Sequence, residues 1–243
     1  MPKADVPRPS APSDAHEPRR LSPTVWALIA VIVGGFFVGY IYITKVAWPD
    51  LRAEESVLPK KARLERDFEA TRSDGQKVSL GQLQGKVMIV APLRIGGADT
   101  GRQLVNGMRK LADIFADDER VYLINIAVDP VNDTPEKLAA FAKELGADRP
   151  RWWFLSGRED ESRSYLIKML QFLPVHKKKP ELQQGPDDTL AWDARIVLVD
   201  QGGHVRRYRD PYDLLLPDPD LRTDALKLLE KDVRRILEEK AGK

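Results

Sequence analysis

The 243-residue chain contains no cysteine and only three histidines, His16, His176 and His204. Without cysteine the chain cannot form disulfides, perform thiol catalysis, or bind zinc or iron–sulfur clusters through thiolates. Three histidines far apart in the sequence leave few ligands for other metals and few groups for acid–base chemistry. We therefore expect no catalytic residues, no metal site and no cofactor, and we predict that the protein is not an enzyme.

A strong charge of either sign is also absent. The 39 basic residues and 37 acidic residues give a net charge of +2, so the chain has no general electrostatic attraction to nucleic acid. Hydrophobic residues make up 42% of the chain and charged residues 31%, which is ordinary for a globular protein. The length fits one domain with appendages.

One long uncharged stretch stands near the start of the chain. Residues 24–44 contain no charged residue, and at about 1.5 Å per residue they can cross a hydrocarbon core of about 30 Å. Trp26 at one end, with Tyr40, Tyr42 and Trp48 at the other, fits interfacial aromatic belts. A cleaved signal peptide is the alternative, but its apolar core is usually shorter and precedes a small-residue cleavage site that we do not find here. We therefore predict an uncleaved anchor.

The stretches around the anchor differ in composition. Residues 1–23 are rich in proline and poor in apolar residues, which predicts a disordered tail. Residues 45–62 are a charged connector, and residues 63–243 form the globular domain. Arg19 and Arg20 precede the anchor, which favours an N-terminus inside the cell. We predict a single-pass protein of a bacterial cytoplasmic membrane, with its domain on the periplasmic or outer side.

The domain alternates short apolar runs with helical periodicity, which predicts an α/β fold with a mixed sheet and helices on both of its faces. Strands are expected at the paired runs 65–71 and 77–80, at 87–90, 121–128 and 152–155, and at the paired runs 196–199 and 205–208. Helices are expected around Leu104–Phe115, from the Thr134-Pro135 start to the Gly146 stop, around Tyr165–Leu170, and around Leu226–Leu237. Residues 173–190 are expected to form a long polar loop.

A glycine-rich segment, Gly96–Gly101, follows the first central strand and begins a helix. Thr100 and Gln103 fit a capping box, in which the threonine hydroxyl accepts a backbone N–H and the glutamine reaches back. The free amides of this segment could instead hold an anion with help from Arg94 or Arg102, although the Lys-Ser/Thr of a phosphate-binding loop is missing. Contact with a partner protein is the third interpretation.

Three segments carry a resemblance to a known family. Residues 74–80 match an opening hairpin, residues 128–136 (VDPVNDTPE) match the pattern DPxxDTP, and residues 198–203 match a late strand and turn. On these motifs residues 65–240 resemble the Sco/SenC family, membrane-anchored copper chaperones that help to build the CuA centre of cytochrome c oxidase. The resemblance implies a thioredoxin-like fold for the domain.

At the positions where that family has its functional residues, this chain has residues of other types. The resemblance places the family's Cys-x-x-x-Cys pair at Gly96 and Thr100, and its metal-binding histidine at Trp192. None of these side chains offers the thiolate, thioether or imidazole donors that copper prefers. The chain therefore resembles a degenerate member of the family that has lost its copper and redox residues. Trp192 is expected to fill the vacated site with apolar bulk, or to anchor a partner.

Two charged clusters have structural and functional interpretations. Asp129, Asp133 and Glu136 could form a hard-metal or acid–base site, but turn formation and the helix dipole explain them more simply. The run from His176 to Lys179 is expected to be a solvated loop, or else a contact for anionic lipid or an acidic partner.

These observations together predict a non-catalytic accessory or assembly protein that acts by protein contact in the biogenesis of a respiratory oxidase. The expected partners are oxidase subunits or a cysteine-bearing paralogue. A copper chaperone with His176, His204 and methionine ligands is one alternative, and an anion-binding module is a weaker one. The contact surface is expected to comprise Gly96, Gly97, Thr100, Trp192, Lys177, Lys178 and Lys179.

Overall fold

A computed structural model describes residues 22–42, 58–97, 99–209 and 219–239, which fall into two units, residues 1–56 and residues 57–243. The first unit contains helix α1 (Pro23–Tyr42), close to the predicted anchor at 24–44. Among the described residues α1 is the one helix long and apolar enough to cross a membrane. Trp48, most of the predicted tail and most of the predicted connector lie outside the described residues.

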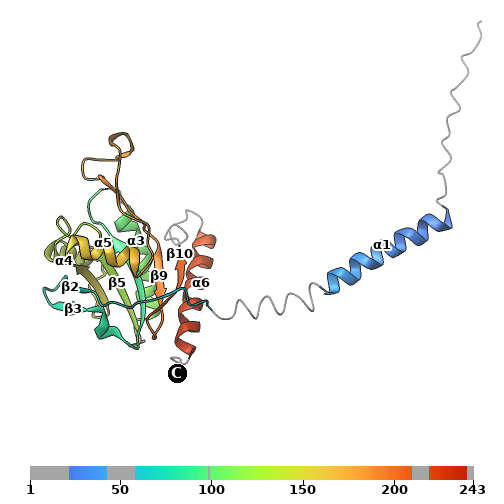
Figure 1. Ribbon diagram of the computed structural model, residues 1–243, viewed down its shortest axis with the longest axis horizontal. Helices are drawn as coiled ribbons and strands as arrows, with labels where there is room; N and C mark the ends of the chain where they lie inside the picture. Colours follow the sequence, from blue (N-terminus) through green and yellow to red (C-terminus); the bar gives the residue numbers. More distant parts are fainter. Residues whose placement is uncertain (1–21, 43–57, 98, 210–218, 240–243) are drawn as a thin grey trace, which may run out of the picture. The chain divides into compact units, whose positions relative to one another are not determined.

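The second unit is a mixed α/β domain built on an eight-stranded sheet in the order β1-β10-β9-β4-β5-β6-β2-β3 (Figure 1). Strands β4, β5 and β6 are parallel, and the other described pairings in this sheet are antiparallel. The strands are β1 (Ala62–Arg63), β2 (Glu69–Arg72), β3 (Lys77–Ser79), β4 (Val87–Leu93), β5 (Val121–Ala127), β6 (Trp152–Ser156), β9 (Ile196–Val199) and β10 (His204–Arg209). The predicted hairpin before β4 is present, although its first strand begins at Glu69.

Helices cover both faces of the sheet, as predicted. Helices α3 (Thr100–Ile114), α4 (Pro135–Glu144) and α6 (Pro219–Glu238) contribute side chains to one core, and α5 (Glu159–Lys168) contributes to the other. Short 3₁₀ turns η2 (Leu80–Leu83) and η3 (Pro180–Leu182) complete the elements. Every residue of β4 is buried because alternate side chains enter the two cores, which explains its continuous apolar run.

The start of α3 differs from the prediction. Asp99 occupies the N-cap position and Thr100 is the first helical residue, and no side chain caps this end. The predicted capping box of Thr100 and Gln103 is therefore wrong; the backbone N–H of Gln103 bonds the carbonyl of Asp99 at 2.9 Å instead. Thr134 does cap α4, where its hydroxyl accepts the N–H of Lys137 at 3.5 Å.

The segment predicted as a polar loop at 173–190 contains regular structure. Strands β7 (His176–Lys177) and β8 (Leu190–Ala191) pair as a separate two-stranded ladder. The chain between them projects from the domain (Figure 1), and Leu182 in this projection is 63% exposed. We call residues 173–191 the projecting hairpin.

A buried arginine fixes the first residues of the domain. The side chain of Arg206 is 1% exposed and donates from Nε to the carbonyl of Leu58 at 2.9 Å. Its guanidinium also pairs with Asp200 at 2.9 Å and with Glu239 at 2.7 Å. Leu58 is fully buried, so the compact unit includes residues that the sequence assigned to the connector.

Candidate functional site

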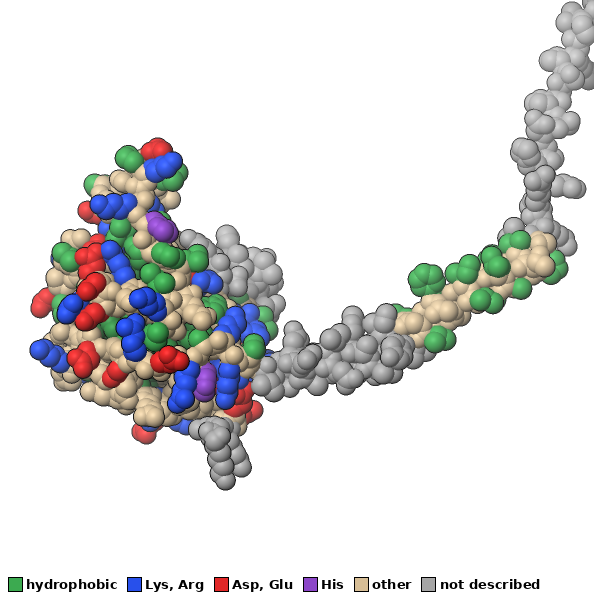
Figure 2. All heavy atoms as spheres, in the orientation of Figure 1, with side chains coloured by type: hydrophobic (Ala, Val, Ile, Leu, Met, Phe, Trp, Pro, Cys, Tyr) green, Lys and Arg blue, Asp and Glu red, His purple; other side chains and the backbone are tan. Residues whose placement is uncertain are grey.

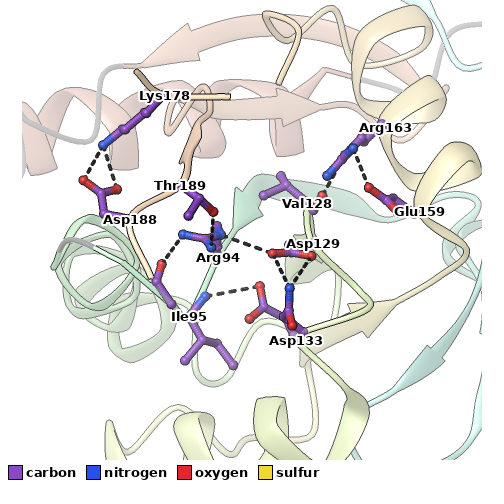
Figure 3. A network of polar contacts seen from close by, with 12 residues as sticks. Arg94, Ile95, Val128, Asp129, Asp133, Glu159, Arg163, Lys178, Asp188 and Thr189 are labelled. Carbon is purple, nitrogen blue, oxygen red and sulfur yellow. Dashed lines mark hydrogen bonds and ion pairs between the residues drawn. The ribbon is translucent and has the colours of Figure 1, made fainter. Parts of the chain in front are cut away.

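The glycine-rich segment lies at the carboxyl end of β4. Since β4 and β5 are parallel neighbours, the segment that follows β5, with Asp129 and Asp133, lies at the same edge of the sheet. The projecting hairpin reaches this edge through Asp188 and Thr189 (Figure 3). Three segments distant in sequence therefore meet at one place.

Arg94 is at the centre of this meeting point. It is only 5% exposed, and its Nε lies 3.4 Å from Oδ2 of Asp129, which is also buried. Nη1 donates to the carbonyl of Gly96 at 2.8 Å, and Nη2 donates to the hydroxyl of Thr189 at 3.2 Å. As Figure 3 shows, one guanidinium joins the glycine-rich segment, the loop after β5 and the hairpin.

The position of Arg94 explains the glycines that follow it. A Cβ on Gly97 would lie 2.8 Å from Nη1 of Arg94, and the φ angle of Gly97 is +99°, a conformation that favours glycine. A Cβ on Gly96 would lie 3.7 Å from Nη2. The guanidinium thus occupies the space next to the side-chain position of residue 96.

Gly101 allows a second close approach. A Cβ there would lie 2.1 Å from the carbonyl oxygen of Arg94, which no side chain can tolerate. Glycine at this position lets the first turn of α3 pack directly against the end of β4.

Two carboxylates support the site from the loop after β5. Asp129 accepts two hydrogen bonds from the amide of Asn132, at 3.1 and 3.0 Å, in addition to its ion pair. Asp133 accepts the backbone N–H of Ile95 at 3.3 Å and is 3% exposed. Burial raises the pKa of Asp133 to about 6, with a smaller upward contribution from the charge of Asp129. Asp129 stabilises the turn through Asn132, as predicted, whereas Asp133 holds the backbone just before the glycine-rich segment through the N–H of Ile95.

The basic run of the hairpin divides into two kinds of side chain. Lys178 forms an ion pair with the buried Asp188, with its Nζ 2.7 Å from both carboxylate oxygens. Lys177 and Lys179 are exposed, as is His176. Lys178 therefore has a structural role in the hairpin, whereas its two neighbours are available at the surface.

Trp192 is half-buried and packs against both hydrophobic cores of the domain. It lies directly after β8 and before β9 in the chain, at the base of the projecting hairpin. This packing favours the interpretation that its ring supplies apolar bulk at this end of the sheet. Thr100 is half-buried at the first position of α3.

The alternative copper ligands do not converge. His204 is the first residue of β10 and contacts Asp200 through Nδ1 at 3.3 Å, whereas His176 lies in β7. Figure 2 shows the two described histidines on separate parts of the domain. Met88 and Met108 are buried in opposite cores. No group of three or more His, Cys, Asp or Glu residues suited to a metal ion occurs in the described part of the chain.

Both arginines that the anion-binding alternative would use are paired with carboxylates. Arg94 is engaged by Asp129 and by two neutral acceptors, and Arg102 pairs with Glu144 at 2.7 Å. The site therefore consists of an arginine whose charge is already neutralised, together with an exposed hairpin.

A family model described as SCO1/SenC matches residues 57–215. A comparison with curated proteins found no significant match.

Solved structures resemble the domain at low sequence identity. A SCO1/SenC family lipoprotein from Bacillus anthracis str. Ames is 22% identical, with a TM-score of 0.58 over 71% of this chain and 94% of that chain. BsSco, described as a member of the Sco family of cytochrome c oxidase assembly proteins with a disulfide switch, is 23% identical, with a TM-score of 0.57 over 75% and 97%. Yeast Sco1 with copper bound is 17% identical, with a TM-score of 0.52 over 73% and 96%. These likenesses show the thioredoxin-like fold that the motifs predicted.

Proposed function

Because the chain belongs to the SCO1/SenC family, we propose that it is a membrane-anchored, non-catalytic accessory protein that acts by protein contact in the assembly of a respiratory oxidase. The description of BsSco as a cytochrome c oxidase assembly protein supports the process. The apolar helix α1 supports the anchor.

The observation that carries this proposal is the buried guanidinium of Arg94. It lies beside Gly96, at one of the positions where the family resemblance places a copper ligand, and it is ion-paired with Asp129. A guanidinium stays protonated at all physiological pH values and cannot coordinate a cation. A fixed positive charge beside residue 96 therefore disfavours a metal cation at that position.

The proposed contact surface surrounds this site. It combines the exposed cations of the hairpin with apolar side chains, including Leu173 and Leu182, each of which is 63% exposed. Its members are Gly96, Gly97, Thr100, Leu173, Lys177, Lys179, Leu182 and Trp192, with Lys178 as internal support.

Extraction of the tagged full chain from its own membranes in a gentle detergent tests the proposal. We expect oxidase subunits, or a cysteine-bearing relative, to co-purify and to remain bound at moderate salt. The variant Lys177→Glu/Lys179→Glu/Leu182→Glu should lose at least about tenfold of this recovery, which corresponds to about 1.4 kcal/mol. The matched control Lys110→Glu/Lys143→Glu/Leu228→Glu alters exposed residues on α3, α4 and α6 and should retain it. Equal loss in both variants, or recovery of the chain alone, contradicts the proposed surface.

Titration with Cu(I) tests the absence of a metal role. The natural chain should form no tight one-to-one complex, and such a complex would overturn the proposal. The graft Gly96→Cys/Thr100→Cys/Trp192→His restores the ligand types that the resemblance implies. We expect it to bind copper weakly while Arg94 is present, and more tightly when Arg94→Thr is added.

We also propose that the N-terminus is inside and the domain outside the cytoplasmic membrane. The absence of cysteine makes this simple to test, because a single Lys110→Cys variant carries one reactive thiol. An impermeant maleimide added to spheroplasts should label it. Labelling only after lysis would place the domain inside.

A further inference from the structure

A run of basic side chains opens the described part of the domain. Lys60, Lys61, Arg63 and Arg66 are exposed, whereas Ala62 and Leu64 between them pack against the core. Along residues 61–64 this alternation is that of an extended strand, with Lys61 and Arg63 on the outward side.

The backbone of this run is held firmly. The N–H of Lys61 bonds the carbonyl of Val205, and the N–H of Leu64 bonds that of Gly203, each at 2.8 Å. Between these bonds β1 pairs with β10 at the edge of the sheet. The cations are therefore presented by a fixed edge strand.

The run borders a hollow of about 260 Å³ at the end of the sheet opposite the Arg94 site. Arg63 and Arg66 line it on one side, and Lys86, just before β4, lines it on another. The turn between β9 and β10 adds the backbone of Gly202 and Gly203. A hollow of this size can hold a phosphate group.

The acidic groups of the hollow are mostly engaged. Asp67 accepts the backbone N–H groups of Phe68 and Gly81, each at 2.7 Å, and the hydroxyl of Ser79. Asp200 pairs with the buried Arg206 at 2.9 Å. Of the carboxylates that line the hollow, Glu65 is the one without such a partner among the described residues.

The cations, in contrast, form no ion pairs. Among the described residues no carboxylate pairs with Lys60, Arg63 or Arg66. Lys61 lies over the ring of Tyr208 at 4.7 Å, and Lys86 donates to the carbonyl of Glu119 at 3.2 Å. Among the described residues none of these five cations pairs with a carboxylate; four are exposed and Lys86 is half-buried. Figure 2 shows Lys and Arg side chains interspersed with Asp and Glu over the face of the domain in view.

We propose that Lys60, Lys61, Arg63, Arg66 and Lys86 bind the phosphate headgroups of anionic membrane lipids. Fifteen residues, 43–57, separate α1 from Leu58 and span at most about 55 Å when fully extended, so their length permits this site to meet the surface of a membrane that α1 spans. Basic residues near an anionic leaflet are attracted to it, and each contributes about fivefold to the partition. Salt weakens this attraction because the side chains are exposed.

Lysine acylation of the full chain in nanodiscs tests the proposal. The discs contain phosphatidylcholine alone, or phosphatidylcholine with phosphatidylglycerol. We expect Lys60, Lys61 and Lys86 to react about fivefold more slowly in the anionic discs. Lys177 and Lys179, on the hairpin, should react equally in both. Equal reactivity of Lys86 in the two kinds of disc would overturn the proposal.

Charge variants separate a specific site from a general charge effect. In Lys60→Gln/Lys61→Gln/Arg63→Gln/Arg66→Gln, Lys86 should lose its protection in anionic discs. The control Lys110→Gln/Lys143→Gln/Lys177→Gln/Lys179→Gln removes the same amount of charge elsewhere, and in it Lys86 should remain protected in anionic discs. If Lys86 loses its protection in the control as well, the proposed site is overturned. A third arm adds inorganic phosphate to neutral discs, where protection of Lys86 would assign the hollow to soluble phosphate and overturn the lipid assignment.

Discussion

The substitution Arg94→Met is the sharpest test of how the glycine-rich segment is held. It keeps an unbranched side chain but removes the guanidinium from a site where the side chains of Arg94 and Asp129 are only 6% and 8% exposed. Asp129 would then be a buried carboxylate without a cation. Breaking a buried pair in this way typically costs about 3–5 kcal/mol.

An exposed ion pair provides a comparison for the size of this loss of stability. Arg102 and Glu144 form an ion pair in which the side chains are 42% and 59% exposed, so Arg102→Met should cost under about 1 kcal/mol. For a domain of this size, 1 kcal/mol shifts the melting temperature by about 2–4 °C. Arg94→Met should therefore lower it by roughly 6–20 °C, and Arg102→Met by at most a few degrees.

Thermal unfolding of the full chain in detergent, followed by tryptophan fluorescence, measures both variants. The double variant Arg94→Met/Asp129→Asn removes the orphaned charge and should recover much of the loss, which gives a large coupling in a double-mutant cycle. The reasoning is refuted if Arg94→Met and Arg102→Met have equal effects, or if adding Asp129→Asn recovers nothing.

Three further predictions concern single residues. Burial raises the pKa of Asp133 from 3.8 to about 6, so the Asp133 carboxyl binds a proton more tightly in the folded state than in the unfolded state. The stability of the domain should therefore fall as the pH rises from about 4 to about 6. Asp133→Asn should therefore stabilise the domain at pH 7.5, by up to roughly 3 kcal/mol, and flatten this part of the pH profile in urea titrations. Gly101→Ala should destabilise the domain by about 2 kcal/mol or more, because its Cβ would overlap the carbonyl of Arg94. In the control Gly85→Ala the new Cβ meets no atom within 4 Å, so any loss of stability there should come from the positive φ angle alone. Arg206→Met should cost about 3–5 kcal/mol by orphaning Asp200, and limited proteolysis should then cleave near Leu58 at a higher rate than in Arg207→Met.

The sequence was sufficient for the fold because its strongest patterns are local. The uncharged run of α1, the apolar run of β4 and the apolar periodicity of α3 each predict one element without knowledge of any other. The capping box at Thr100 failed because the neighbouring Asp99 takes the N-cap position. The ladder of the projecting hairpin was missed because β7 and β8 contain only two residues each, too few for an alternating pattern.

The centre of the candidate site was harder to predict. Arg94 and Asp129 are 35 residues apart, and a single arginine after a strand has no periodicity that marks it as buried. A signal did exist, since Arg94 and Asp129 each follow one of two strands predicted to be central, and the ends of parallel neighbours meet at one edge. The contact of Thr189 with Arg94 has no comparable signal, because it depends on the path of the hairpin.

The ion pair between Arg94 and Asp129 also limits how this surface can respond to its surroundings. A metal centre can be filled or emptied, and a cysteine pair can be oxidised or reduced, so each has two states that a cell can set. A guanidinium held by covalent bonds cannot be removed by a chelator, is inert to thiol reagents and keeps its proton at any pH the cell experiences. The proposed contact surface around it would therefore be constitutive, with its occupancy by a partner set by the partner's concentration rather than by copper supply or redox poise.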